Sequence, residues 1–85
     1  MGLFKPKWKH SDPDVRKEAV KKIEDQGLLK NIAKNDVVDL VRMEAVKRLE
    51  DQNTIADISK HDEKEYVRET AVEKLEDQEA LACKE

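Results

Sequence analysis

Apart from its many carboxylates, this chain has few of the side chains most used as nucleophiles, bases or metal ligands: His10, Ser11, Ser59, His61 and Cys83. Catalysis needs such a group held against a partner in a cleft that excludes water. The two histidines sit in corresponding turns about two sequence repeats apart, too distant to share a metal, and His61 beside Asp62 lacks a third ligand. Gly2 and Gly27 are the only glycines, so there is no glycine-rich phosphate loop. We therefore predict no enzyme, no cofactor and no metal site.

Charged side chains, in contrast, return at a fixed spacing. Arginine occurs every 26 residues, at Arg16, Arg42 and Arg68, inside the apolar face of a predicted helix. An unpaired guanidinium is costly there, so each arginine is expected to find a carboxylate. The candidates are an acid three residues earlier (Asp39 for Arg42, Glu65 for Arg68) or an acid of the adjoining unit. We interpret these arginines as structural groups of the seam between units, with ligand binding as the alternative.

A second set of charged columns is the candidate interaction surface. It comprises Lys17, Lys21, Lys22, Met43, Lys47, Arg48, Glu69, Glu73 and Lys74. The interpretation without a binding role is that these side chains form solvent-exposed ion pairs along each helix, because Glu18 and Glu44 stand four residues before Lys22 and Arg48. Binding of a protein partner and binding of a nucleic-acid backbone are the two alternatives.

The element that must position these side chains is written three times. Residues 15–26, 41–52 and 67–78 share Val, Arg, Ala, Val, Glu, Asp and Gln at the same places. A fixed period in this range is typical of stacked repeat architectures. Each unit is predicted to hold a longer amphipathic helix and then a shorter one, with Asp25, Asp51 and Asp77 capping the shorter helix after a corner of one or two residues. Leu29, Ile32, Ala33, Ile55, Ile58 and Ser59 form the inner face of the shorter helices.

The pattern Asp-x-x-Val-Arg-x-x-Ala-Val-x-x-Leu, present from Asp39 to Leu49, resembles the HEAT-like helical repeats. The likeness covers residues 11–85 and is closest to the short form related to phycobilisome-lyase repeats. It implies a stack of helical hairpins with an arginine to aspartate ladder. It also keeps a lyase-type or other enzyme subunit as a third functional alternative, because proteins with this fold have many functions.

Composition sets further bounds. The chain has 85 residues, 44% of them charged, and a net charge of −3. The first 22 residues carry +4 and the rest −7, so a general nucleic-acid binder is disfavoured. No long apolar run indicates a signal peptide or a membrane span, and the single Cys83, interpreted as a small apolar filler, forms no internal disulfide. We expect a cytoplasmic protein.

The predicted organisation is a leader and one domain. Residues 1–10 lie outside the pattern, and Leu3, Phe4 and Trp8 are expected to cap the first repeat; a membrane anchor and a loose tail are the alternatives. Residues 11–85 are predicted to form a right-handed all-α solenoid of three hairpins, at about 11–35, 36–61 and 62–85. The predicted function is non-enzymatic: a protein interaction or scaffold module with an unidentified protein partner. Nucleic-acid or anionic-surface binding through the basic leader and first repeat is the alternative, and a homodimer could cover the clipped third repeat, including Leu75 and Leu81.

Overall fold

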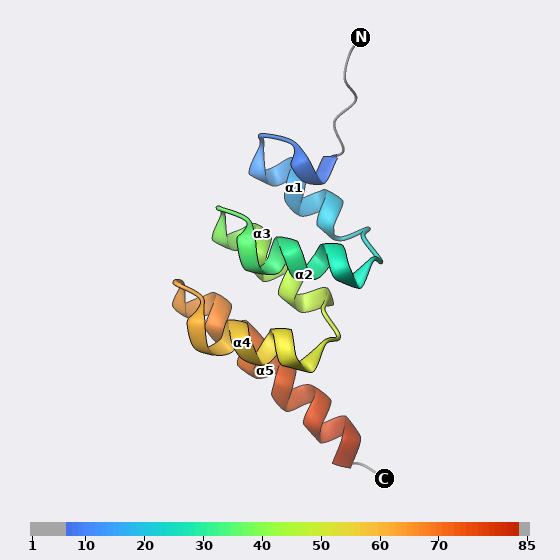
Figure 1. Ribbon diagram of the computed structural model, residues 1–85, viewed down its shortest axis with the longest axis vertical. Coiled ribbons are helices and arrows are strands. Elements are labelled where there is room, and N and C mark those ends of the chain that lie inside the picture. The colour runs from blue at the N-terminus through green and yellow to red at the C-terminus, as the bar shows by residue number, and fades with distance from the viewer. Residues whose placement is uncertain (1–6, 84–85) are drawn as a thin grey trace.

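A computed structural model describes the backbone of residues 7–83 and the side chains of residues 8–77. Over these residues every regular element is helical, which confirms the all-α prediction. A short 3-10 helix, η1 (Lys7–Lys9), precedes five α-helices: α1 (Pro13–Val20), α2 (Gln26–Asn35), α3 (Asp39–Arg48), α4 (Gln52–His61) and α5 (Glu65–Cys83) (Figure 1). None of the described helices is long and apolar enough to cross a lipid bilayer.

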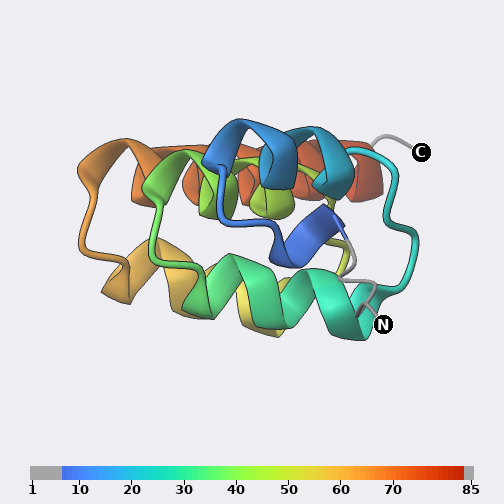
Figure 2. The ribbon, with the colours of Figure 1, turned by 90° about the horizontal axis from the view of Figure 1, so that it is seen from above.

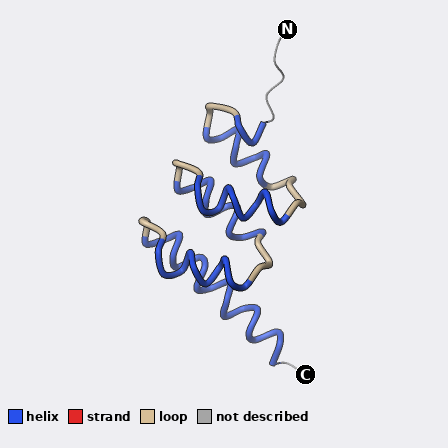
Figure 3. Tube along the Cα trace, viewed as in Figure 1, coloured by secondary structure: helices blue, strands red, loops and turns tan. Residues whose placement is uncertain are grey.

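The helices lie in two layers. Helices α1, α3 and α5 follow one another in one layer, and α2 and α4 lie in the other (Figure 2). Helix α3 packs between α1 and α5, while α2 packs closely on α3 and α4 closely on α5. These close pairs are joined by the short turns 36–38 and 62–64 (Figure 3). The most intimate helix pairs therefore cross the predicted unit boundaries, which had grouped α1 with α2 and α3 with α4.

Aspartates begin three of the helices, and two of them, Asp25 and Asp51, are caps that the sequence predicts. The side chain of Asp12 accepts a hydrogen bond from the N–H of Asp14, and Asp25 and Asp51 do the same for the first turns of α2 and α4. The prediction of a longer first helix in each pair is wrong. Helix α1 has 8 residues and α2, α3 and α4 have 10 each, because α1 and α3 end before the predicted corner. The connections span residues 21–25 and 49–51.

The third predicted corner is also wrong, because α5 runs on without a break through Asp77. The break between α1 and α2, which Asp25 caps, is stabilised by contacts with the chain at the end of α3. The amide of Gln26 donates to the carbonyl of Arg48 at 3.2 Å and its Oε1 accepts from the N–H of Glu50 at 3.0 Å. No described helix follows α5 to offer such contacts, and the residues after Asp77 are good helix formers, Gln-Glu-Ala-Leu-Ala. The helix propensity of these residues therefore decides the backbone after Asp77, and α5 continues.

The core lies between the two layers. Leu29, Ile32 and Ala33 of α2 and Ile55 and Ile58 of α4 are buried, as predicted. The layer of α1, α3 and α5 contributes small and branched residues at the predicted positions: Val20, Val41, Ala45, Val46, Leu49, Val67 and Ala71. Ala45 and Ala71 have no exposed surface, so the helix axes can approach closely there.

One aromatic residue of the predicted leader, Trp8, lies within the described side chains. Trp8 in η1 is half-buried and packs against the core, and the ammonium of Lys9 lies 5.1 Å from the centre of its ring. That residues 1–10 cap a first repeat stays a prediction. Leu3 and Phe4 lie outside the described residues.

Candidate functional site

The recurring arginines join each turn to the next one. The Arg16 guanidinium binds the carboxylate of Asp36 through Nε and Nη2, both at 3.0 Å. Arg42 binds Asp62 in the same way, at 2.8 and 3.0 Å. Such two-point pairing uses the full planar fork of an arginine. The predicted partners three residues earlier, Asp39 and Glu65, are not the ones used. The alternative, an acid of the adjoining unit, is confirmed for Arg16 and Arg42.

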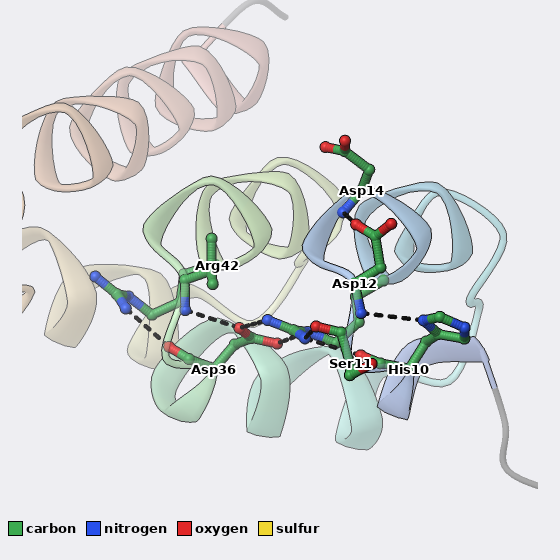
Figure 4. A network of polar contacts seen from close by, with 8 residues as sticks. His10, Ser11, Asp12, Asp14, Asp36 and Arg42 are labelled. Atoms are coloured by element: carbon green, nitrogen blue, oxygen red, sulfur yellow. Dashed lines mark hydrogen bonds and ion pairs between the residues drawn. The ribbon is translucent and has the colours of Figure 1, made fainter.

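The remaining guanidinium nitrogen closes the turn in front of each helix. Nη1 of Arg16 donates to the carbonyl of His10, Nη1 of Arg42 to that of Asp36, and Nη1 of Arg68 to that of Asp62. Asp36 therefore takes part in two levels at once, because its carboxylate binds Arg16 while its carbonyl binds Arg42 (Figure 4). Its Oδ1 also accepts from the N–H of Val38. These aspartates thus shape the turn and do not cap the helix, because the N-cap of α3 is Val38.

His10 occupies the column of Asp36 and Asp62. Its Nδ1 accepts from the N–H of Asp12 at 3.0 Å, as the two aspartates accept from Val38 and Lys64 (Figure 4). An imidazole nitrogen can accept this hydrogen bond, but the ring has no carboxylate that could bind an arginine at two points. His10 is therefore a turn residue in the structure.

The Arg42 pair is almost fully enclosed. The side chains of Arg42 and Asp62 are 10% and 6% exposed. Burial works to raise the pKa of Asp62, but the hydrogen bonds from Arg42 and from the N–H of Lys64 prevail and hold that pKa below its ordinary value. The hydrogen bond to Asp62 likewise raises the pKa of Arg42. Both groups are therefore charged at neutral pH.

The repeated cations Arg48 and Lys74 bind backbone carbonyls. Nη2 of Arg48 donates to the carbonyl of Ile23 at 2.9 Å, and Nζ of Lys74 donates to the carbonyl of Lys47. Both carbonyls lie at the C-terminal end of the preceding helix of the layer, or just beyond it, where the dipole favours a cation. This use was missed, because the sequence offered Glu44 as an equally good partner for Arg48.

Other members of the predicted interaction surface are dispersed. Met43 is half-buried and packs against the core, and Lys17 is half-buried. Lys47 is exposed. Lys21 is paired with Glu18 at 3.1 Å.

Lys22, the first cation of its column, lines a shallow hollow at the α1 end together with Asp14, Val15, Glu18 and Ala19. The predicted pair of Lys22 with Glu18 is therefore replaced by the pair of Lys21 with Glu18.

Two members, Glu69 and Glu73, do converge on a groove. It has a volume of about 610 Å³ and is lined by Ser59 of α4 and by Glu65, Arg68, Glu69, Val72 and Glu73 of α5. We call it the Arg68 groove. The carboxylates of Glu65, Glu69 and Glu73 are exposed and follow one another at intervals of four, along one side of α5.

The Arg68 groove corresponds to surfaces that are covered elsewhere in the molecule. Val20 and Val46, in the column of Val72, have no exposed surface, whereas Val72 is 40% exposed. Asp36 and Asp62 hold the Nε and Nη2 atoms of Arg16 and Arg42, but no carboxylate of a described residue pairs with those atoms of Arg68. Ser59, Glu65 and Val72 were not predicted to belong to an interaction surface. The sequence does contain a pattern that points to the pairing of these arginines: an acid, Asp36 or Asp62, stands 20 residues after Arg16 and after Arg42.

The remaining candidates for chemistry do not converge. Nε2 of His61 lies 3.7 Å from the carboxylate of Asp57, within one exposed helical turn. The Oγ of Ser59 donates to the carbonyl of Ala56. Among the described residues no group of three or more His, Cys, Asp or Glu is placed to hold a metal ion. The side chain of Cys83 lies outside the described residues.

No protein-family model, curated protein or solved structure matches this chain. The likeness to HEAT-like repeats therefore rests on the residue pattern, and the fold is stated as a small all-helical domain with five described α-helices.

Proposed function

We propose that this chain is a non-enzymatic protein interaction module, built as a short right-handed stack of HEAT-like helical repeats. The 26-residue sequence period supports the stack, together with the two Arg–Asp pairs whose atoms and distances match. The observation that carries the interaction role is the Arg68 groove. In this groove Arg68 and Val72 repeat Arg42 and Val46, which the next helix pair covers, but Val72 remains 40% exposed.

The groove has the composition of a binding surface rather than of a solvated face. Val72 supplies apolar surface, Arg68 supplies spare hydrogen-bond donors, and its guanidinium is already held in place by the carbonyl of Asp62. An arginine fixed in this way loses little side-chain entropy when a partner binds. Arginines of this kind are common at the centre of protein interfaces.

The alternative of nucleic-acid binding has less support. Lys21 is paired with Glu18, and Lys22 shares its hollow with Asp14 and Glu18. These acids reduce the positive field at the α1 end, on which phosphate binding depends. Complete flow-through on a polyanion matrix at low salt would remove this alternative.

A photo-crosslinking residue at position 72 tests the interaction role in native cells. The matched control places the same residue at exposed position 24, outside the groove. We expect a discrete crosslinked protein from position 72 that is absent from position 24 and absent when Arg68→Asp is added. Equal products from both positions, or no product from position 72, would contradict the proposal.

A further inference from the structure

We propose that the Arg68 groove binds a helix of another protein that carries one aspartate followed by lysine or arginine four, eight and twelve residues later. This inference rests on the proposed function and names the chemistry of the partner. It follows from two occupied versions of the same surface within the molecule, which both fix the position of the aspartate, and from the packing of α5 on α3, which fixes a direction and a register.

The position of the aspartate follows from the arginine fork. Asp36 and Asp62 each present both carboxylate oxygens to Nε and Nη2 of an arginine, at 2.8 to 3.0 Å. Arg68 is held by its Nη1 atom in the same way as Arg16 and Arg42 are, so its other two donors form the same fork. A carboxylate is the group that such a fork binds at two points.

The direction and register follow from the helices behind these aspartates. Asp62 stands just before α5, and α5 packs along α3. Tyr66, four residues after Asp62, lies close enough to the carboxylate of Asp39 to lower its pKa, while Lys74, twelve residues after Asp62, binds the carbonyl of Lys47. Residues four, eight and twelve after the aspartate therefore face positions 39, 43 and 47 of the preceding helix.

On α5 the corresponding positions are Glu65, Glu69 and Glu73. In α3 they are Asp39, Met43 and Lys47, which carry no net charge together, so the groove of α5 has an acidic stripe where the internal surface has none. Like charges spaced by four residues along a helix repel one another and destabilise it. Cations at the facing positions of a partner would remove this repulsion and add attraction.

A second copy of this chain does not fit the groove. The α1 end offers His10 in the column of the aspartate, and the residues four, eight and twelve later are Asp14, Glu18 and Lys22. In the same register Asp14 would face Glu65 and Glu18 would face Glu69, so two of the three contacts repel. Two copies joined through the same groove would place glutamates against glutamates. The charges therefore favour a different, basic partner.

A designed helical peptide tests this recognition with the full chain. The probe carries an aspartate, lysines four, eight and twelve residues later, and Val and Ala five and nine residues later, where α5 carries the buried Val67 and Ala71. Binding is measured by fluorescence anisotropy at low salt, and backbone chemical-shift changes locate the site. We expect saturable binding with shifts at Arg68 and Val72. Changing the aspartate of the probe to asparagine should weaken binding about tenfold, because one charge-assisted pair is lost.

Charge exchange provides the matched control. The variant Glu69→Lys with Glu73→Lys should lose the lysine probe at least tenfold and should bind a probe with glutamates at the same places. Arg68→Gln should bind the aspartate and asparagine probes alike, because it removes the positive charge that pairs with the carboxylate. These side chains are exposed or at the groove edge, and circular dichroism confirms that each variant is folded. The inference is overturned if charge exchange transfers no binding, or if the asparagine probe binds wild type as tightly as the aspartate probe.

Two further outcomes separate this inference from the proposed function. If position 72 crosslinks a cellular protein but the designed probe does not bind, the partner chemistry is wrong while the interaction role stands. If sedimentation shows a dimer that Glu69→Lys with Glu73→Lys dissociates, the occupant is a second copy and the inference falls. We expect a monomer.

Discussion

Arg42 and Arg68 begin from the same local structure and end in different surroundings. Each follows a turn whose carbonyl it binds, and each is followed four residues later by a valine. Arg42 is closed by Asp62 and its valine, Val46, has no exposed surface, while Val72 is 40% exposed. The local sequence therefore positions the guanidinium of each arginine, but the guanidinium is buried only where a further helix pair packs over it. The largest stabilising contribution should therefore come from Arg42.

Replacing Arg42 by Met should have the largest effect, about 3 kcal/mol of lost unfolding free energy, because it leaves the carboxylate of Asp62 buried without its partner. Arg68→Met should cost less than about 1 kcal/mol, since it removes one hydrogen bond at a half-buried site. Thermal melts measure both, and roughly 4 to 8 °C corresponds to 1 kcal/mol at this size. Equal shifts for the two variants would break the comparison.

Acidic pH should lower the folding stability, because it protonates the carboxylate of Asp62 that pairs with Arg42. Its pKa is lowered in the folded state, mainly by Arg42 working against burial. The stability from this shift is therefore fully present above the unfolded pKa of about 3.9 and is lost as pH falls through the lower folded pKa. Urea midpoints should be level near neutral pH and fall below about pH 4.

Asp39, Asp51 and Asp57 also have lowered pKa values, owing chiefly to Tyr66, Thr54 and Lys34 in that order. They act in the same direction, so Asp62→Asn should reduce the acid dependence without abolishing it. A urea midpoint that rises between pH 5 and pH 3 would reverse the sign of this prediction.

The two valines sharpen the same comparison without charge. Val46→Ala should cost about 2 kcal/mol, because it leaves a small cavity in a fully covered layer. Val72→Ala should cost under about 0.5 kcal/mol, since water can fill the space. Urea unfolding gives the free energy of unfolding of both variants. The dependence of that free energy on urea concentration should be unchanged. A Val72 value as large as that of Val46 would mean that the groove is covered in solution.

The last prediction concerns the helix break that the sequence analysis places before Gln78. Gln26 and Gln52 are the first residues of α2 and α4, where proline is tolerated, but position 78 lies inside α5. Gln78→Pro should therefore lower the helical circular dichroism signal while the free energy of unfolding in urea changes by less than about 0.5 kcal/mol, because the end of a helix can unfold without the rest of the chain. An unchanged helical signal would show that a corner forms at Asp77 after all.

The sequence predicted the parts of the fold that local chemistry decides. Asp25 and Asp51 cap helices as expected, and Leu29 and Ile55 are buried, because capping and apolar periodicity act over a few residues. It failed at Asp77, whose side chain is of the same type, because the break after Asp25 depends on Gln26 reaching a distant backbone.

The candidate site was predicted only in part. Glu69 and Glu73 were named, and they line the groove. Val72 was taken as a packing residue, because its column is buried at Val20 and Val46. Whether it is covered depends on the helices that follow it in space, which no local pattern reports.

The bonds between helices also bear on how the chain folds. Among the described residues, the side-chain hydrogen bonds and ion pairs that join one helix to another helix or its turn link residues 20 to 27 positions apart, from the Arg16 pair to the contact of Lys74. No such bond requires the two ends of the chain to meet, so each loop closed during folding is short. We expect rapid folding for this size, with opening that begins at the α5 end and moves inward one helix pair at a time.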